Sequence, residues 1–86
     1  MKLAELLATV KPGSRDWSWQ QEAINIIHYD AIHMALLIES IQVYGQQRPV
    51  VIGSDGRLWD GHHRVVAHIL LMREDIDVTY DTEECA

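Results

Sequence analysis

A β-hairpin followed directly by an apolar helix constrains the fold more than any other part of the chain. Residues 50–52 and 57–60 read as the two strands, and the Asp55-Gly56 pair is a strong reversal signal. The hairpin therefore spans about 49–60. The run that follows predicts a helix over about 61–73, whose apolar residues cover more than one narrow stripe. Such a helix is buried on most sides or also meets a partner.

A second helix is predicted over about 30–44. Asp30 is a good N-cap residue and Gly45 a good residue to end a helix. Between them the apolar side chains follow the i, i+3, i+4, i+7 spacing of one buried face: Met34, Leu37, Ile38 and Ile41. Residues 76–81 alternate and predict a closing strand, whereas residues 24–27 fit either a strand or a helix. The order helix, hairpin, helix, strand indicates an α+β fold.

Size and charge limit the possible functions. With 86 residues, the chain forms one small domain of modest stability, or one that self-association stabilises. A formal charge of −6 argues against autonomous DNA binding, because neutralisation of phosphates supplies most of the affinity of nucleic-acid binders. Residues 45–73 are nevertheless locally positive, so an anionic ligand stays open. The charged residues there are Arg48, Arg57, Arg64 and Arg73 against Asp55 and Asp60.

The single cysteine, Cys85, can form no internal disulfide, and no cysteine spacing suggests a zinc knuckle. No apolar run approaches the ~20 residues that a membrane span needs. The N-terminus is too polar and too short for a secretory signal. We therefore expect a cytoplasmic protein without membrane contact.

The segment DGHHR lies where the hairpin meets the helix. The first turn of a helix leaves backbone N–H groups without partners and carries a partial positive charge. Gly61 allows close backbone approach, and Arg64 adds a planar fork of donors suited to phosphate oxygens. His62 and His63 can add donors that titrate near neutral pH. With Asp60 beside it, this turn is suited to an anion.

Two other interpretations of the turn stay open. In the first, Asp60 is only the N-cap of a solvated helix start. In the second, the turn binds a metal through Asp60, His62, His63 and His68. Adjacent histidines point about 100° apart on a helix, and a five-residue spacing fits one helix face poorly. We therefore predict no metal site, and we interpret His28 and His33 as surface or cap residues.

Two sequence blocks resemble the ParB/sulfiredoxin superfamily. LIESIQVYGQQRPVVI, residues 37–52, is similar to its helix, glycine and apolar strand, and DGRLWDGHHRVVA, residues 55–67, is similar to its hairpin and following helix. The resemblance covers residues 30–79. It implies one small ParB-like domain with a mixed sheet, in which residues 1–29 are an N-terminal extension and residues 80–86 an acidic tail.

The resemblance also implies a ligand. In nucleotide-binding members a Gly-x-x-Arg-x-x-Ala segment cradles a triphosphate, and the matching residues here are Gly61, Arg64 and Ala67, with His62 and His63 in the variable positions. A Gly-x-x-x-Pro block borders the base or sugar, and it corresponds to Gly45, Gln47, Arg48 and Pro49. The implied ligand is a nucleotide, CTP or ATP, with Mg²⁺.

The departures of this sequence from the family pattern disfavour some of the activities known in the family. His62 stands where sulfiredoxins carry a catalytic cysteine, so peroxiredoxin repair is disfavoured. No helix-turn-helix part is covered, so specific operator recognition is not expected. Some relatives are nucleases or phosphorylate free serine, and Glu39 is the nearby carboxylate that would act as the base. Small stand-alone versions resemble bacteriophage proteins, which implies the cytoplasm of a bacterial host.

Three functions follow from these observations. The favoured one is a binding module whose GHHR turn holds the phosphates of a nucleotide or a nucleic acid. The second is a metal-dependent nuclease or phosphotransferase, with His62 or His63 as acid/base and Glu39 as a further candidate. The third is a ligand-free interaction domain of a phage that contacts a second copy or a host protein. Trp59 is expected to pack on the hairpin rather than stack on a base.

Overall fold

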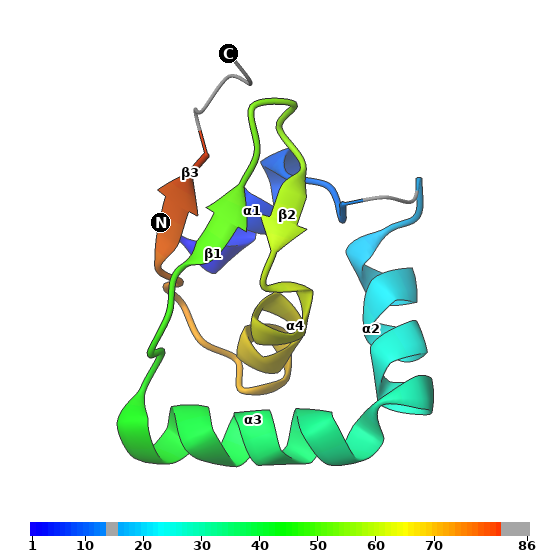
Figure 1. The fold of residues 1–86 in the computed structure, drawn as a ribbon, viewed down its shortest axis with the longest axis vertical. Helices are drawn as coiled ribbons and strands as arrows, with labels where there is room; N and C mark the ends of the chain where they lie inside the picture. Colours follow the sequence, from blue (N-terminus) through cyan, green and yellow to red (C-terminus); the bar gives the residue numbers. More distant parts are fainter. Residues whose placement is uncertain (14–15, 82–86) are drawn as a thin grey trace.

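The fold is α+β, as the sequence predicts (Figure 1). The computed structural model describes residues 1–13 and 16–81. Within them it contains three strands and four helices: α1 (Leu3–Thr9), α2 (Trp19–Tyr29), α3 (Ala31–Tyr44), β1 (Val50–Ile52), β2 (Leu58–Asp60), α4 (His62–Leu70) and β3 (Val78–Tyr80). No helix in the described part of the chain has the length and apolar character needed to cross a membrane.

The three strands form one mixed sheet in the order β2-β1-β3. β1 and β2 are the antiparallel arms of the predicted hairpin, with Val51 opposite Asp60 and an irregularity between Val51 and Ile52. β3 runs parallel to β1, with Val50 opposite Val78. The hairpin and the closing strand are therefore confirmed, and the mixed sheet that the family resemblance implies is present.

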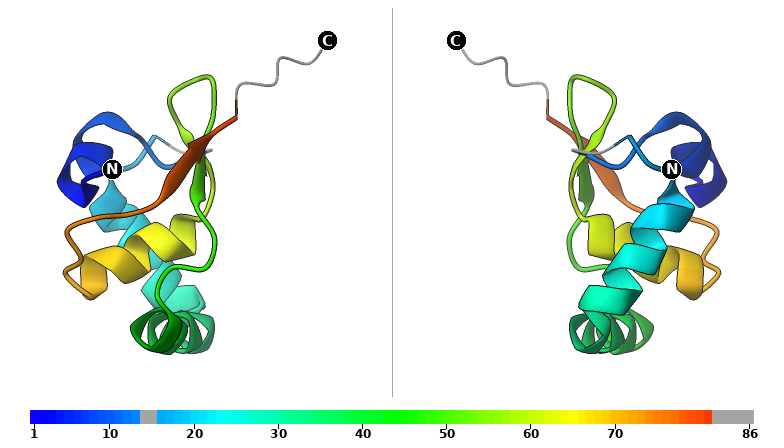
Figure 2. Two further views of the ribbon diagram at one scale, coloured as in Figure 1. Left: turned by 90° about the vertical axis from the view of Figure 1, so that its left-hand side faces the viewer. Right: turned by 90° about the vertical axis from the view of Figure 1, so that its right-hand side faces the viewer.

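α4 is the centre of the fold because it is buried on two sides. Val65 belongs to a core cluster shared with the sheet and α1, and Val66 and Ala67 belong to a second cluster shared with α2 and α3. Figure 2 shows α1 and α4 on the same side of the sheet. This double burial explains why the apolar residues of α4 cover a wide arc, and it leaves little of that arc for an external partner.

The described part of residues 1–29 is built into the core rather than appended to it. Leu3, Leu6 and Trp19 are buried in the cluster that underlies the sheet. The ambiguous segment around residues 24–27 is helical, and α2 begins with a capping box in which Ser18 and Gln21 bond each other's backbone N–H. That reciprocal bonding favours the helix over a strand.

Helix α4 begins one residue after a glycine and ends earlier than predicted. Gly61 is its N-cap residue, with φ of 100°, and no side chain caps the helix, so the interpretation of Asp60 as the N-cap is wrong. A Cβ at position 61 would lie 2.6 Å from Val50 Cγ1, so the strand beneath the junction demands glycine. The helix ends at Leu70 instead of 73, because the chain turns through Met72 at φ of 55°.

The outer face of α3 is exposed and apolar. Ile32, Leu36 and Val43 share this face and are 80%, 62% and 64% exposed. The opposite face carries Met34 and Ile41, which are buried as the spacing predicts. Of the predicted acidic tail, residues 82–86, including Cys85, lie outside the described residues.

Candidate functional site

A cleft of about 450 Å³ opens at the start of α4. Its floor is the whole DGHHR turn, and its walls come from α2, α3 and the loop before α2, with lining residues Pro12, Gly13, Trp17, Glu22, Asn25, His33, Leu37, Asp60, Gly61, His62, His63 and Arg64. The volume lies within the ~300–1,000 Å³ typical of small-molecule sites. The structure therefore brings the five consecutive residues of the turn to one cavity.

Arg64 joins this cleft to a neighbouring cavity of about 170 Å³, which Gln47 and Arg48 also line. Its Nη1 atom is buried and has no hydrogen-bond partner among the described residues. A buried charged donor without an acceptor costs free energy, typically ~1–3 kcal/mol or more. Because Arg64 lines both cavities, a rotation of its guanidinium would bring Nη1 to an acceptor in either of them.

The backbone at the start of α4 also offers hydrogen-bond donors beside Arg64. Gly61 starts α4 in the left-handed conformation, and no side chain caps the first turn. The N–H groups of that turn and the positive end of the helix dipole face the junction between β2 and α4. Gly61 and Arg64 therefore lie together at the start of α4 and both line the cleft, and anion binding there stays a prediction.

His62 has a structural bond that the sequence does not reveal. Its Nε2 accepts a hydrogen bond of 2.8 Å from the N–H of Gly13, so the ring is neutral in this arrangement and carries its proton on Nδ1. Burial lowers the pKa of His62, and the charges of Glu22 and Asp60 oppose this effect only in part. His62 therefore joins the N-terminal loop to α4, and its Nε2 is occupied rather than available for acid–base chemistry.

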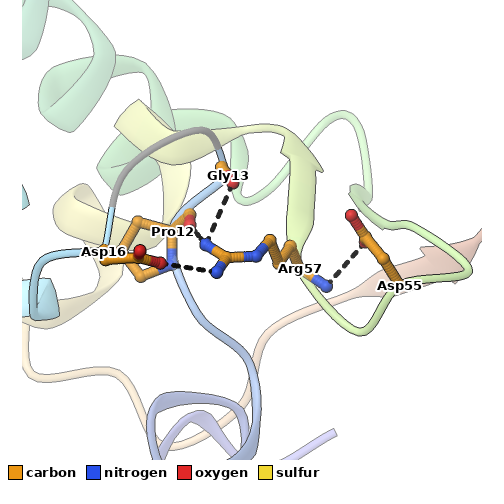
Figure 3. Close-up of polar contacts among 5 residues, drawn as sticks. All are labelled: Pro12, Gly13, Asp16, Asp55 and Arg57. Atoms are coloured by element: carbon orange, nitrogen blue, oxygen red, sulfur yellow. Dashed lines mark hydrogen bonds and ion pairs between the residues drawn. The ribbon is translucent and has the colours of Figure 1, made fainter.

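Arg57 fixes the same loop from the other side (Figure 3). Its guanidinium donates to the carbonyl oxygens of Pro12 and Gly13, each at 3.3 Å, and to Asp16 Oδ1 at 2.7 Å. The bond and the charge of Arg57 lower the pKa of the Asp16 carboxyl. Asp55 in turn accepts from the backbone N–H of Arg57. Arg57 thus fixes the loop that forms one wall of the cleft. From the sequence it is expected only to add positive charge.

Two histidines and a carboxylate meet at the edge of the cleft. Asp30 Oδ2 lies 2.7 Å from His63 Nε2 and 3.4 Å from His33 Nδ1. The two imidazoles are stacked, with centroids 4.8 Å apart. Both contacts lower the pKa of Asp30, the bond from His63 most strongly. From the sequence alone, His33 is interpreted as a surface or cap residue and His63 is not placed beside it, although Asp30 and His33 are three apart and so share one helix face.

Several predicted site residues lie outside the cleft. Glu39 is on the exposed face of α3, opposite the buried Met34 and Ile41, and lines neither cavity. Gln47 and Arg48 border only the smaller cavity, and the neighbouring Gln46 holds that loop to the Asp77 backbone. Of the three candidate catalytic residues, His63 alone lines the cleft with its Nε2 beside a carboxylate.

His68 and Trp59 have structural partners. His68 is buried, and its Nδ1 lies 2.6 Å from the Arg64 carbonyl oxygen. Trp59 packs over Gly53 and donates to Asp55, as expected for a residue of the hairpin. Trp17 lines the cleft, together with Glu22 and Asn25 of α2. Sequence reasoning missed these three because it assigned no role to residues 1–29.

No protein-family model matches the chain, and neither a curated protein nor a solved structure matches it. The resemblance to the ParB/sulfiredoxin superfamily therefore stays a prediction. The function has to be argued from the cleft itself.

Proposed function

We propose that the cleft binds the phosphate groups of a nucleotide, with Arg64 as the principal donor. The observation that carries the proposal is the buried Nη1 of Arg64, which has no acceptor among the described residues. A phosphate oxygen in the cleft would accept from the guanidinium of Arg64, once a rotation turns this nitrogen toward the cavity, and from the N–H groups at the start of α4. Gly61 lines the cleft beside these N–H groups.

The charge of the cleft favours a phosphate that arrives with a cation. Glu22 and Asp60 line the cavity together with Arg64. Two carboxylates would repel a bare polyphosphate, whereas Mg²⁺ is typically held by one or two carboxylates and the phosphates of its substrate. The proposed ligand is therefore a magnesium nucleotide, such as CTP or ATP.

A single nucleotide fits better than a nucleic-acid strand. The cleft is lined by α2, α3 and the loop before α2, and its volume is about 450 Å³. The chain carries a formal charge of −6, which disfavours contact with a long phosphate backbone. Trp17 on the cleft wall offers an aromatic surface on which one base could stack. A nucleotide ligand also agrees with a cytoplasmic location.

A melting screen tests this proposal. CTP, ATP, GTP, ADP and a single-stranded oligonucleotide are each added with and without Mg²⁺. A nucleotide at ~100 times its dissociation constant should stabilise the fold by about 2.7 kcal/mol. Stabilisation by the oligonucleotide alone would favour nucleic acid, and no shift with any of the compounds would contradict phosphate binding.

Self-association through the outer face of α3 is a second candidate function. The exposed row Ile32, Leu36 and Val43 has Glu39 as its only charged neighbour in α3. Because the chain is acidic overall, two copies repel each other least where the surface carries almost no charge. Light scattering after size-exclusion chromatography should show a dimer that Leu36→Glu converts to a monomer. A wild-type monomer at the highest concentration would contradict this second function.

A further inference from the structure

The strongest feature that phosphate binding does not use is the cluster of Asp30, His33 and His63. One ligand atom from each residue lies within 4.8 Å of the other two. Asp30 precedes α3, His33 is in the first turn of α3, and His63 is in the first turn of α4. Two helices that pack against each other therefore present three metal-ligating side chains to one point.

The carboxylate of Asp30 does not cap helix α3. Asp30 occupies the N-cap position of α3, where an aspartate usually accepts from the backbone of the first turn. No such bond is present. Its Oδ2 instead receives both imidazoles, at 2.7 Å and 3.4 Å. A carboxylate oxygen can accept two N–H bonds, and the same convergence of one oxygen and two imidazole nitrogens also suits a shared cation.

The distances fit a small divalent ion after a minor adjustment. Tetrahedral zinc holds nitrogen ligands at ~2.0–2.1 Å and carboxylate oxygens at ~2.0–2.2 Å, which places neighbouring ligand atoms ~3.3 Å apart. The 3.4 Å between His33 Nδ1 and Asp30 Oδ2 already matches this spacing. The 2.7 Å between His63 Nε2 and Asp30 Oδ2 has to lengthen by several tenths of an ångström. The ligand nitrogens of His33 and His63 lie within 4.8 Å of each other and have to take the same spacing. Rotation of the partly exposed side chains supplies both movements.

We propose that Asp30, His33 and His63 form a binding site for a divalent transition-metal ion of the zinc type. Two imidazoles and one carboxylate are borderline ligands, which select zinc and its neighbours over magnesium and calcium, whose preferred ligands are all oxygens. The site differs in this respect from the magnesium nucleotide proposed above, and it does not depend on that proposal.

The site is open on one side and reachable from solvent. Three protein ligands leave at least one coordination position for water or a ligand, the arrangement of catalytic rather than structural zinc sites. His33 and His63 both line the 450 Å³ cleft, so this position faces the cavity that contains Arg64. The side chain of His33 is 61% exposed, which gives the ion a path of entry.

Metal titration of the whole chain, produced without a polyhistidine tag and stripped with chelator, tests the site. Cobalt(II) is added first, because its visible absorption reports low-coordinate nitrogen and oxygen ligation, and zinc then displaces it. We expect one equivalent of cobalt to bind with a visible band, and zinc to replace it. Calcium and magnesium in equal excess should leave the band unchanged.

Variants identify the ligands. His33→Gln and Asp30→Asn should each weaken zinc binding by about tenfold or more, at least the effect of removing a group that only supports a ligand. His28→Gln is the matched control, because His28 is exposed, close in sequence and outside the cluster. It should bind zinc like the wild type. His33 is exposed, so its variant should keep the melting temperature measured in chelator.

Equal zinc affinity in His33→Gln and the wild type would overturn the proposal. So would the absence of a cobalt band, or displacement of cobalt by magnesium. Because all titrations omit nucleotide, failure of the metal site leaves the phosphate proposal intact, and failure of the melting screen leaves the metal site intact.

Discussion

Replacement of Gly61 by alanine should destabilise the fold strongly, because two separate costs coincide there. With φ of 100°, Gly61 has a backbone conformation that costs an L-residue about 1–2 kcal/mol. The added Cβ would also lie 2.6 Å from Val50 Cγ1 and 3.2 Å from Val50 Cα, within the core under the sheet. Overpacking of this kind costs about 1–3 kcal/mol. The free energy of unfolding should therefore fall by about 2–5 kcal/mol.

Gly56→Ala is the matched control for this prediction. Gly56 has φ of 78°, yet a Cβ there would meet nothing within 4 Å, so only the conformational cost of about 1–2 kcal/mol applies. Thermal and urea unfolding followed by circular dichroism measure both variants. A domain of this size loses about 4–8 °C of melting temperature per kcal/mol. Equal losses in the two variants would refute the argument that Val50 fills the space beside Gly61.

Three further predictions concern residues in and around the cleft. Because burial lowers the pKa of His62 in the folded chain, the unfolded chain binds a proton there more readily, and the free energy of unfolding should fall as the pH drops below about 6.5. His62→Gln should flatten this dependence when melting temperatures are measured against pH. An unchanged slope would contradict the buried, Gly13-bonded state of His62. Arg57→Met should lower the free energy of unfolding, measured with urea, by about 1–3 kcal/mol. The loss should exceed that of Asp16→Asn, because Arg57 also donates to two backbone carbonyl oxygens. A larger loss in Asp16→Asn would contradict the structural role of Arg57. Glu39→Gln should leave nucleotide-dependent stabilisation unchanged, since Glu39 lies outside both cavities, and a loss of that stabilisation would place the ligand elsewhere.

Local signals were enough to predict the hairpin and the limits of α3. The Asp55-Gly56 reversal, the apolar spacing from Met34 to Ile41 and the terminal Gly45 each depend on residues close in sequence. The helix start at Gly61 was also visible, because a glycine between a strand and an apolar run has a local meaning. The early end of α4 was not, since Leu70, Leu71 and Met72 continue the apolar pattern while the backbone turns at Met72.

The candidate site could be predicted only on its α4 side. Gly61 and Arg64 are neighbours in sequence, and their suitability for an anion follows from the physics of a helix start. The cluster of Asp30, His33 and His63 depends on α3 packing against α4, and the wall that contains Trp17 depends on the bond between Gly13 and His62. Such contacts between distant segments have no periodic signature. The bond from Gly13 to His62 Nε2 likewise appears only when the chain is folded.

Isothermal titration of ATP with Mg²⁺ into the wild type and into Arg64→Gln tests the central proposal most directly. The loss of charge-assisted hydrogen bonds worth about 1.5–3 kcal/mol should weaken binding by roughly 10- to 100-fold. Arg73→Gln makes the same change of charge near the other end of α4, where Arg73 contacts the Ile41 carbonyl, and it should bind like the wild type. Saturable binding that Arg64→Gln alone weakens is the predicted result. Equal affinity in all three proteins would contradict a phosphate site at the start of α4.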